Sequence, residues 1–247
     1  RALVRGYPYN PQKILNPLFM NFLKTLWKAI DVFLAMSGLR LDSGRMLFAW
    51  IPLLGLSTGL LYYVDQNGYH IPYIICTWIF YYLGISLILG TNIKRVMAQK
   101  FGEDKALAFY DMICGLMFFN IGTGISAAAL HNTEAFELSL NLKWGLFALL
   151  SFVGFGIKFW ATWVVGINTY YFRDLFLDRA QGEFTAAGPY KFLPNPMYGV
   201  GNFHAYAGAV MTCSTFGLWY ALACHVGIYG FYFFVEKPFI KRVYLEG

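Results

Sequence analysis

Four polar side chains flank a long apolar stretch in the C-terminal part of the sequence: Tyr190, Asn195 and Tyr198 before it and Glu236 after it. The stretch, 199–235, is about twice as long as one membrane crossing. If it folds back on itself, its two ends meet at the same interface. The flanking hydroxyl, amide and carboxylate groups then form one polar pocket beside the lipid headgroups.

The backbone around Asn195 suits a stiff turn into this stretch. Pro194 and Pro196 flank the asparagine, and each proline fixes its own φ and biases the preceding residue away from helix. Gly199 and Gly201 then permit close backbone approach. We expect Pro196 and both glycines to shape the same pocket.

The histidines offer an acid-base group but no metal site. His204 lies about two turns beyond Tyr198, and a histidine beside a polar pocket can act as a general base. The alternative for His204 is a role in hydrogen bonding between packed helices. Neither His204 nor His225 has a second ligand at metal spacing, so the sequence does not support a metal mechanism.

Asp111 and Lys158 are charged residues inside apolar runs, where a charge costs at least about 2.5 kcal/mol. Asp111 lies near the start of its run and could reach headgroup water. Lys158 lies deeper, where its stem can snorkel or its ammonium can pair with a carboxylate on a neighbouring helix. Neither residue identifies a reaction.

The composition assigns the chain to the membrane. Of the 247 residues, 58% are hydrophobic, 20% aromatic and 13% charged, with a mean hydropathy of +0.49, whereas a soluble domain has about 25% charged residues. This excludes a soluble globule and also a disordered chain, which would be poor in apolar residues. The net charge of +6 comes from basic residues beside apolar runs, so it indicates membrane orientation and not nucleic-acid binding.

We predict an all-α polytopic fold with four transmembrane helices, a C-terminal helical hairpin and an N-terminal interfacial helix. A membrane crossing needs about 20 apolar residues, and four such runs occupy 46–64, 71–90, 107–130 and 145–166. The longer stretch 199–235 is interrupted at 213–217, which predicts a hairpin that enters and leaves on one side.

Lysines and arginines concentrate on alternate connections. The loops 65–70 and 131–144 together contain one, Lys143, whereas the other connections and both ends of the chain are basic. Both termini are therefore predicted on the cytoplasmic side or its organellar equivalent. The membrane would be the endoplasmic reticulum or the mitochondrial inner membrane in a eukaryote, and the inner membrane in a bacterium.

The segment 18–38 has the pattern of an amphipathic helix. Two sets of side chains would occupy opposite faces: Leu23, Leu26, Trp27, Ile30, Phe33 and Leu34 on one, and Lys24, Lys28 and Asp31 on the other. Such a helix suits the membrane surface, and packing on a partner subunit is the alternative. We divide the chain into a basic N-terminal segment with this helix, 1–45, and one integral-membrane domain, 46–247.

The C-terminal motifs carry a family resemblance. Asn-Pro-Met-Tyr at 195–198 enters the predicted hairpin, which ends in a turn containing Glu236, followed by Pro-Phe and, four residues on, Val-Tyr. From about 188 to 244 this arrangement resembles the phospholipid N-methyltransferases, which share a class of integral-membrane methyltransferases with the isoprenylcysteine carboxyl methyltransferases. The isoprenylcysteine branch typically has Arg-His-Pro where this chain has Pro-Asn-Pro, which favours the phospholipid branch.

The resemblance implies methyl transfer from S-adenosylmethionine to the amine of phosphatidylethanolamine and its methylated forms, with membrane phospholipids as partners. It implies that Glu236 binds the α-ammonium of the donor and that Asn195 and Tyr198 shape the donor pocket. The family also uses a Gly-any-Gly element in a preceding helix, for which Gly154 and Gly156 are the match. Glycines at this spacing equally serve helix packing.

Position 237 departs from the family pattern. Phospholipid methyltransferases usually carry two consecutive glutamates there, whereas Glu236 is followed by Lys237, and a lysine would repel the ammonium of the donor. Three functions stay open. The chain is an active phospholipid N-methyltransferase, an inactive methyltransferase-like structural subunit of a larger membrane complex, or an enzyme that methylates another lipid or a prenylated acceptor.

Overall fold

The structure, a computed structural model, describes residues 17–40, 46–131, 134–181 and 185–246. Within these ranges the chain is built from helices, as predicted, and its β-bridge between Ala135 and Ser214 is isolated. Several basic residues used for the predicted orientation fall outside the described residues, namely Arg1, Arg5, Lys13 and Arg45.

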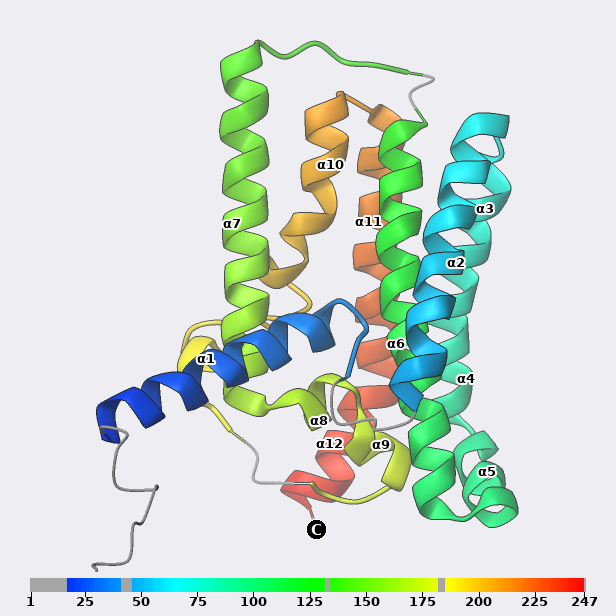
Figure 1. Cartoon of the computed structure of the whole chain (residues 1–247), viewed down its shortest axis with the longest axis vertical. Helices are drawn as coiled ribbons and strands as arrows, with labels where there is room; N and C mark the ends of the chain where they lie inside the picture. Colours follow the sequence, from blue (N-terminus) through cyan, green and yellow to red (C-terminus); the bar gives the residue numbers. More distant parts are fainter. Residues whose placement is uncertain (1–16, 41–45, 132–133, 182–184, 247) are drawn as a thin grey trace, which may run out of the picture.

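Four helical stretches in the described part of the chain are long and apolar enough to cross a membrane. They are His70–Gly90, Glu103–Leu130 (α6), Leu140–Val165 (α7) and Thr215–Leu245. The first three confirm the apolar helices predicted at 71–90, 107–130 and 145–166. The run 46–64 forms α2 (Met46–Asn67), which packs against α6 in the same bundle (Figure 1).

Two of the long stretches are composite. The first joins α3 (His70–Trp78) to α4 (Gly84–Gly90) through a π-helical turn. The second joins α11 (Thr215–Phe231) to α12 (Lys237–Ile240) through the π-helical turn Tyr232–Glu236. The second turn ends at Glu236, and π-helical turns inside α-helices are frequent at functional sites.

The connections separate to the two ends of the bundle as the charge pattern predicts. The α2–α3 and α6–α7 connections lie together at one end, with the rings of His70 and His131 5.3 Å apart. The C-terminus and α5 (Ile93–Phe101) lie at the opposite end (Figure 1). The side of the membrane that each end faces stays a prediction.

The hairpin has its break where the sequence predicts it. Helix α10 (His204–Thr212) ends before Cys213, which has a left-handed backbone with φ of 54°. Ser214 caps α11, because its hydroxyl accepts the N–H of Gly217 at 3.0 Å. A Cβ on Gly217 would lie 2.8 Å from the Cβ of Ala209, so this glycine lets the two arms pack closely.

Helix α1 (Pro17–Met36) runs across the lower part of the bundle rather than parallel to the long helices (Figure 1). Val32 and Ala35 are buried against the bundle, whereas Trp27 and Phe33 are more than half exposed. The ammonium of Lys28 lies 4.3 Å from the ring centre of Trp163 on α7. The predicted apolar face is thus largely uncovered by protein, as an interfacial helix requires.

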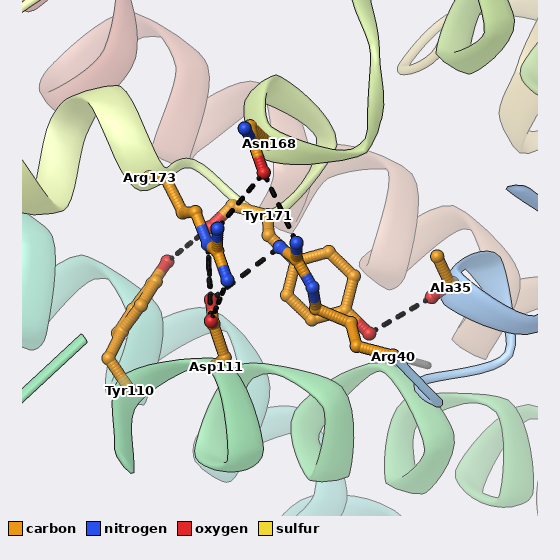
Figure 2. A network of polar contacts seen from close by, with 7 residues as sticks. All are labelled: Ala35, Arg40, Tyr110, Asp111, Asn168, Tyr171 and Arg173. Carbon is orange, nitrogen blue, oxygen red and sulfur yellow. Dashed lines mark hydrogen bonds and ion pairs between the residues drawn. The ribbon is translucent and has the colours of Figure 1, made fainter. Parts of the chain in front are cut away.

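Asp111 on α6 anchors a buried polar network (Figure 2). Its side chain is 3% exposed, and both carboxylate oxygens accept from the Arg173 Nε, at 3.0 and 3.1 Å. Arg40 lies 3.8 Å from the same carboxylate, and Asn168 accepts from both arginines. Asp111 therefore pairs with arginines instead of reaching headgroup water.

Two tyrosine hydroxyls extend this network to the backbone. Tyr110 donates to the carbonyl of Tyr171 at 2.8 Å, and Tyr171 donates to the carbonyl of Ala35 at 3.1 Å (Figure 2). The network thus joins α1, α6 and the segment of α8 (Ile167–Tyr170) and α9 (Arg173–Leu177). This segment forms one wall of the candidate site.

Candidate active site

The two ends of the hairpin meet around a cavity of about 630 Å³ at the end of the bundle that carries the C-terminus. Five of the residues predicted to form a site line it together: Tyr190, Asn195, Pro196, Tyr198 and Glu236. The remaining wall comes from the end of α7, from α9 and from α12. The folding back of the apolar stretch explains why residues about 40 positions apart converge here.

The turn before the hairpin is held by its own backbone. Gly188 has a φ of +59°, and a Cβ there would lie 2.7 Å from Val164, so glycine allows the turn to pack on the end of α7. The N–H of Gly199 donates to the carbonyl of Asn195 at 2.8 Å, and that of Gly201 to the carbonyl of Pro196 at 2.7 Å. The cavity wall is therefore fixed before any ligand binds.

Three buried polar atoms in the cavity wall make no hydrogen bond of good geometry with a described residue: the hydroxyls of Tyr190 and Tyr198 and one carboxylate oxygen of Glu236. The hydroxyl of Tyr198 nevertheless lies beside the Glu236 carboxylate and interacts with it. Burial, and after it the negative charge of Glu236, raises the pKa of both tyrosines, so their hydroxyls stay protonated at neutral pH. An unsatisfied buried group costs about 1–3 kcal/mol. The wall thus presents one acceptor and two donors to a ligand.

A second carboxylate in the cavity comes from Asp174, which is not among the site residues predicted from the sequence. Asp174 is 3% exposed and accepts from the N–H of Leu175 at 2.9 Å and from the hydroxyl of Tyr244 at 3.1 Å. Burial is the main cause that raises its pKa. Tyr244 belongs to the Val-Tyr motif, which was the available signal for this part of the wall.

Lys237 borders the cavity, but its ammonium lies over the exposed ring of Phe233, 5.5 Å from the ring centre. The lysine side chain is itself exposed. Glu236 and Lys237 therefore diverge: the carboxylate is at the inner wall, and the ammonium lies against an outer aromatic surface.

The other predicted site residues lie away from this cavity. A Cβ on Gly154 would meet the backbone nitrogen of His204, so Gly154 is a helix-packing position, and Gly156 has no atom within 4 Å of a built Cβ. Gly199 and Gly201 contribute backbone to the turn. His204 lines a neighbouring cavity of about 540 Å³, where its Nδ1 donates to the carbonyl of Gly201 at 2.7 Å.

Comparison with known proteins agrees with the C-terminal motifs. Residues 144–247 match the family model described as phospholipid methyltransferase. Several curated relatives of the chain carry the name phosphatidylethanolamine N-methyltransferase. Those from Neosartorya fischeri and Schizosaccharomyces japonicus are each 31% identical, over 43% and 42% of this chain. The one from Malassezia globosa is 27% identical over 68% of this chain.

The matches cover small parts of the relatives. The aligned residues span 11% of the length of the first two proteins and 17% of the third. No solved structure matches the chain. The comparisons therefore bear on the C-terminal part of the chain, which includes the turn and the hairpin of the candidate site.

Proposed function

We propose that the chain transfers methyl groups from S-adenosylmethionine to the amine of phosphatidylethanolamine-type headgroups, from the premise that residues 144–247 match the phospholipid methyltransferase family model. The observation that carries the proposal is the convergence of Tyr190, Tyr198 and Glu236, each with an unmatched buried polar atom, on one cavity. The cavity lies at an end of the bundle, where lipid headgroups and a water-soluble donor are both accessible.

The charges of the cavity fit the donor. S-adenosylmethionine carries an ammonium, a sulfonium and a carboxylate, and when bound it supplies a methyl group on positively charged sulfur. Glu236 holds the ammonium through a charge-assisted hydrogen bond. The hydroxyls of Tyr190 and Tyr198 donate to oxygen acceptors of the donor. Asp174 supplies a second negative charge to the cavity. In the family pattern this charge comes from the second of two consecutive glutamates, at the position of Lys237 in this chain.

The neighbouring cavity supplies the acceptor side of the reaction. It shares Met197 and Tyr198 with the cavity around Glu236, which we call the donor cavity. An amine in the neighbouring cavity would therefore lie close to a methyl donor in the donor cavity. A protonated amine has no free lone pair, so the acceptor amine must lose a proton before it attacks the methyl group. His204 faces the same cavity as a neutral ring: its Nδ1 donates to Gly201, so its lone pair is on Nε2, where it can accept a hydrogen bond from the amine.

Methyl transfer to vesicle lipids tests the proposal. The purified chain is incubated with S-adenosylmethionine labelled in its methyl group and with vesicles of phosphatidylethanolamine, and the labelled lipids are separated. We expect mono-, di- or trimethylated phosphatidylethanolamine from the wild type and much less from Glu236→Gln at the same donor concentration. Transfer to a farnesylated cysteine instead would support the prenylated acceptor. An absence of any transfer would support the inactive structural subunit.

A further inference from the structure

The cavity next to the donor site has the features of an anion site inside an apolar chamber. It is lined by α6, α7 and α10, largely with aromatic and aliphatic side chains. Among its described lining residues Lys158 is the one lysine or arginine, and none is an aspartate or glutamate. Phe155 lines the cavity with half of its surface exposed, so the chamber reaches the lipid-facing surface of α7.

Two hydrogen-bond donors in this cavity are unmatched. The ammonium of Lys158 makes no hydrogen bond or ion pair with any described residue, so the predicted pairing with a carboxylate on a neighbouring helix is not formed there. The side-chain amide nitrogen of Asn202 is buried and also has no partner among the described residues. An ammonium and an amide N–H without hydrogen-bond acceptors in an apolar chamber lower the stability of the fold, unless a ligand supplies the acceptors.

The depth of Lys158 suits a lipid phosphate. Lys158 lies seven residues before the end of α7 at Val165, which is about 10 Å along the helix axis. A helix of 26 residues is about 39 Å long, whereas the hydrocarbon core is about 30 Å thick. The long lysine stem bridges the remaining distance to the level of the headgroups.

We propose that this chamber binds one glycerophospholipid, with its phosphodiester held by Lys158 and Asn202 and its acyl chains along α6 and α7. The proposal rests on the proposed function and names the residues that position its acceptor. In an ethanolamine lipid the amine lies two carbons beyond the phosphate oxygen. A phosphate at Lys158 therefore keeps the amine within a few ångströms, on the side where Met197 and Tyr198 separate the two cavities.

Lipid binding tests this assignment without methyl transfer. The probes are phosphatidylmethanol, which has a phosphodiester and no amine, and diacylglycerol with the same acyl chains and no phosphate. Native mass spectrometry of the purified protein measures the bound lipid. We expect the wild type to bind phosphatidylmethanol at least about tenfold more tightly than diacylglycerol, because the charge-assisted hydrogen bonds require the phosphate. Equal binding of the two lipids by the wild type would overturn the proposal.

Variants at Lys158 locate the interaction. Lys158→Met keeps the apolar stem and should lower phosphatidylmethanol affinity about tenfold, whereas Lys158→Arg keeps the charge and should stay within about threefold of the wild type. Asn202→Leu should lower the affinity about threefold. Unchanged phosphatidylmethanol binding in Lys158→Met would also overturn the proposal.

Donor binding separates this inference from the proposed function. Binding of S-adenosylmethionine is measured for the same variants and serves as a check of folding. Glu236→Gln should lose donor affinity and keep phosphatidylmethanol binding, and Lys158→Met should show the reverse. If the wild type binds the lipid through Lys158 but not the donor, the lipid site stands and the methyltransferase function fails.

Discussion

Asp111 and Lys158 are both charges within candidate membrane-spanning helices, and their surroundings differ in one respect. Asp111 is enclosed by arginines and an asparagine, and its carboxylate is paired within the protein (Figure 2). Lys158 borders a cavity and has no partner among the described residues. The same contrast separates the Asp111 network from the donor cavity, where buried atoms of Tyr190, Tyr198 and Glu236 are also unmatched.

This difference separates structural from ligand-binding polar groups. A charge inside the membrane is tolerated when the protein pairs it, and then its removal leaves its partner uncompensated. A charge or polar group that the protein leaves unmatched lowers stability, and a ligand is what can satisfy it. Stability and ligand binding should therefore respond in opposite ways to substitutions in the two regions.

The largest effect is expected at Asp111. Asp111→Ala removes the carboxylate that lies beside the buried Arg40 and the partly buried Arg173, and we expect a loss of about 3–5 kcal/mol in stability. Lys158→Met is the matched control, since it also removes one charge from a long apolar helix but leaves no uncompensated partner. Its stability should be equal to that of the wild type or greater. Thermal unfolding in one detergent checks both, and a larger loss in Lys158→Met than in Asp111→Ala would break the comparison.

The next effect concerns the turn that enters the hairpin. Asn195→Ala and Tyr198→Ala should each lower methyl transfer about 10 to 1000-fold, as expected when one positioned contact is lost. Asn195→Ala should unfold at nearly the wild-type temperature, because Asn195 is neither in the core nor in the Asp111 network. Tyr198 is buried in the core, so Tyr198→Phe, which removes only the hydroxyl, serves as the variant that preserves packing. Initial rates on phosphatidylethanolamine vesicles at matched protein concentration measure the effect. Rates near that of the wild type in both alanine variants would place the active site elsewhere.

A smaller, pH-dependent effect is expected at Asp178, which joins α5 to the C-terminal helix through Lys94, Arg95 and Arg242. Burial alone would raise its pKa, but the hydrogen bonds from Arg95 and Arg242 and the charge of Lys94 outweigh this and lower the pKa to about 2, from an ordinary 3.8. The carboxylate then contributes about 1 kcal/mol to stability above pH 4, because solvent screens its pairs with the exposed arginines, and this is lost as the pH falls toward 2.

Asp178→Asn isolates this contribution. The difference in unfolding free energy between wild type and variant should be largest at pH 6 and should shrink at pH 3. A difference that stays constant over this range would show that the ion pairs around Asp178 do not stabilise the fold.

The sequence predicts the parts of this molecule that depend on local chemistry. Apolar runs of sufficient length predict the long helices, and the polar break at 213–217 predicts the hairpin. Once the hairpin is predicted, the meeting of Tyr190, Tyr198 and Glu236 follows, because its two arms end at the same interface.

The remaining features depend on pairings that no local pattern encodes. Asp111 and Arg173 are 62 residues apart, and their contact requires the path of α8 and α9 beneath the bundle. The same path brings Asp174 into the donor cavity. The divergence of Glu236 and Lys237 also could not be predicted, since it depends on the π-helical turn that ends at Glu236 and on the exposed Phe233 ring.

Calorimetric titration with S-adenosylmethionine tests most directly whether the unmatched groups of the donor cavity form a ligand site. The wild type should bind, and Glu236→Gln should weaken binding by about 1.5–3 kcal/mol, or about 10 to 150-fold, for the loss of a charge-assisted hydrogen bond. Lys237→Glu should change the affinity less than about threefold, because Lys237 lies over Phe233. Binding that appears only in Lys237→Glu would show that this lysine occupies the second carboxylate position and blocks the donor. An absence of binding by all three proteins would contradict the enzymatic function and favour an inactive structural subunit of a larger membrane complex.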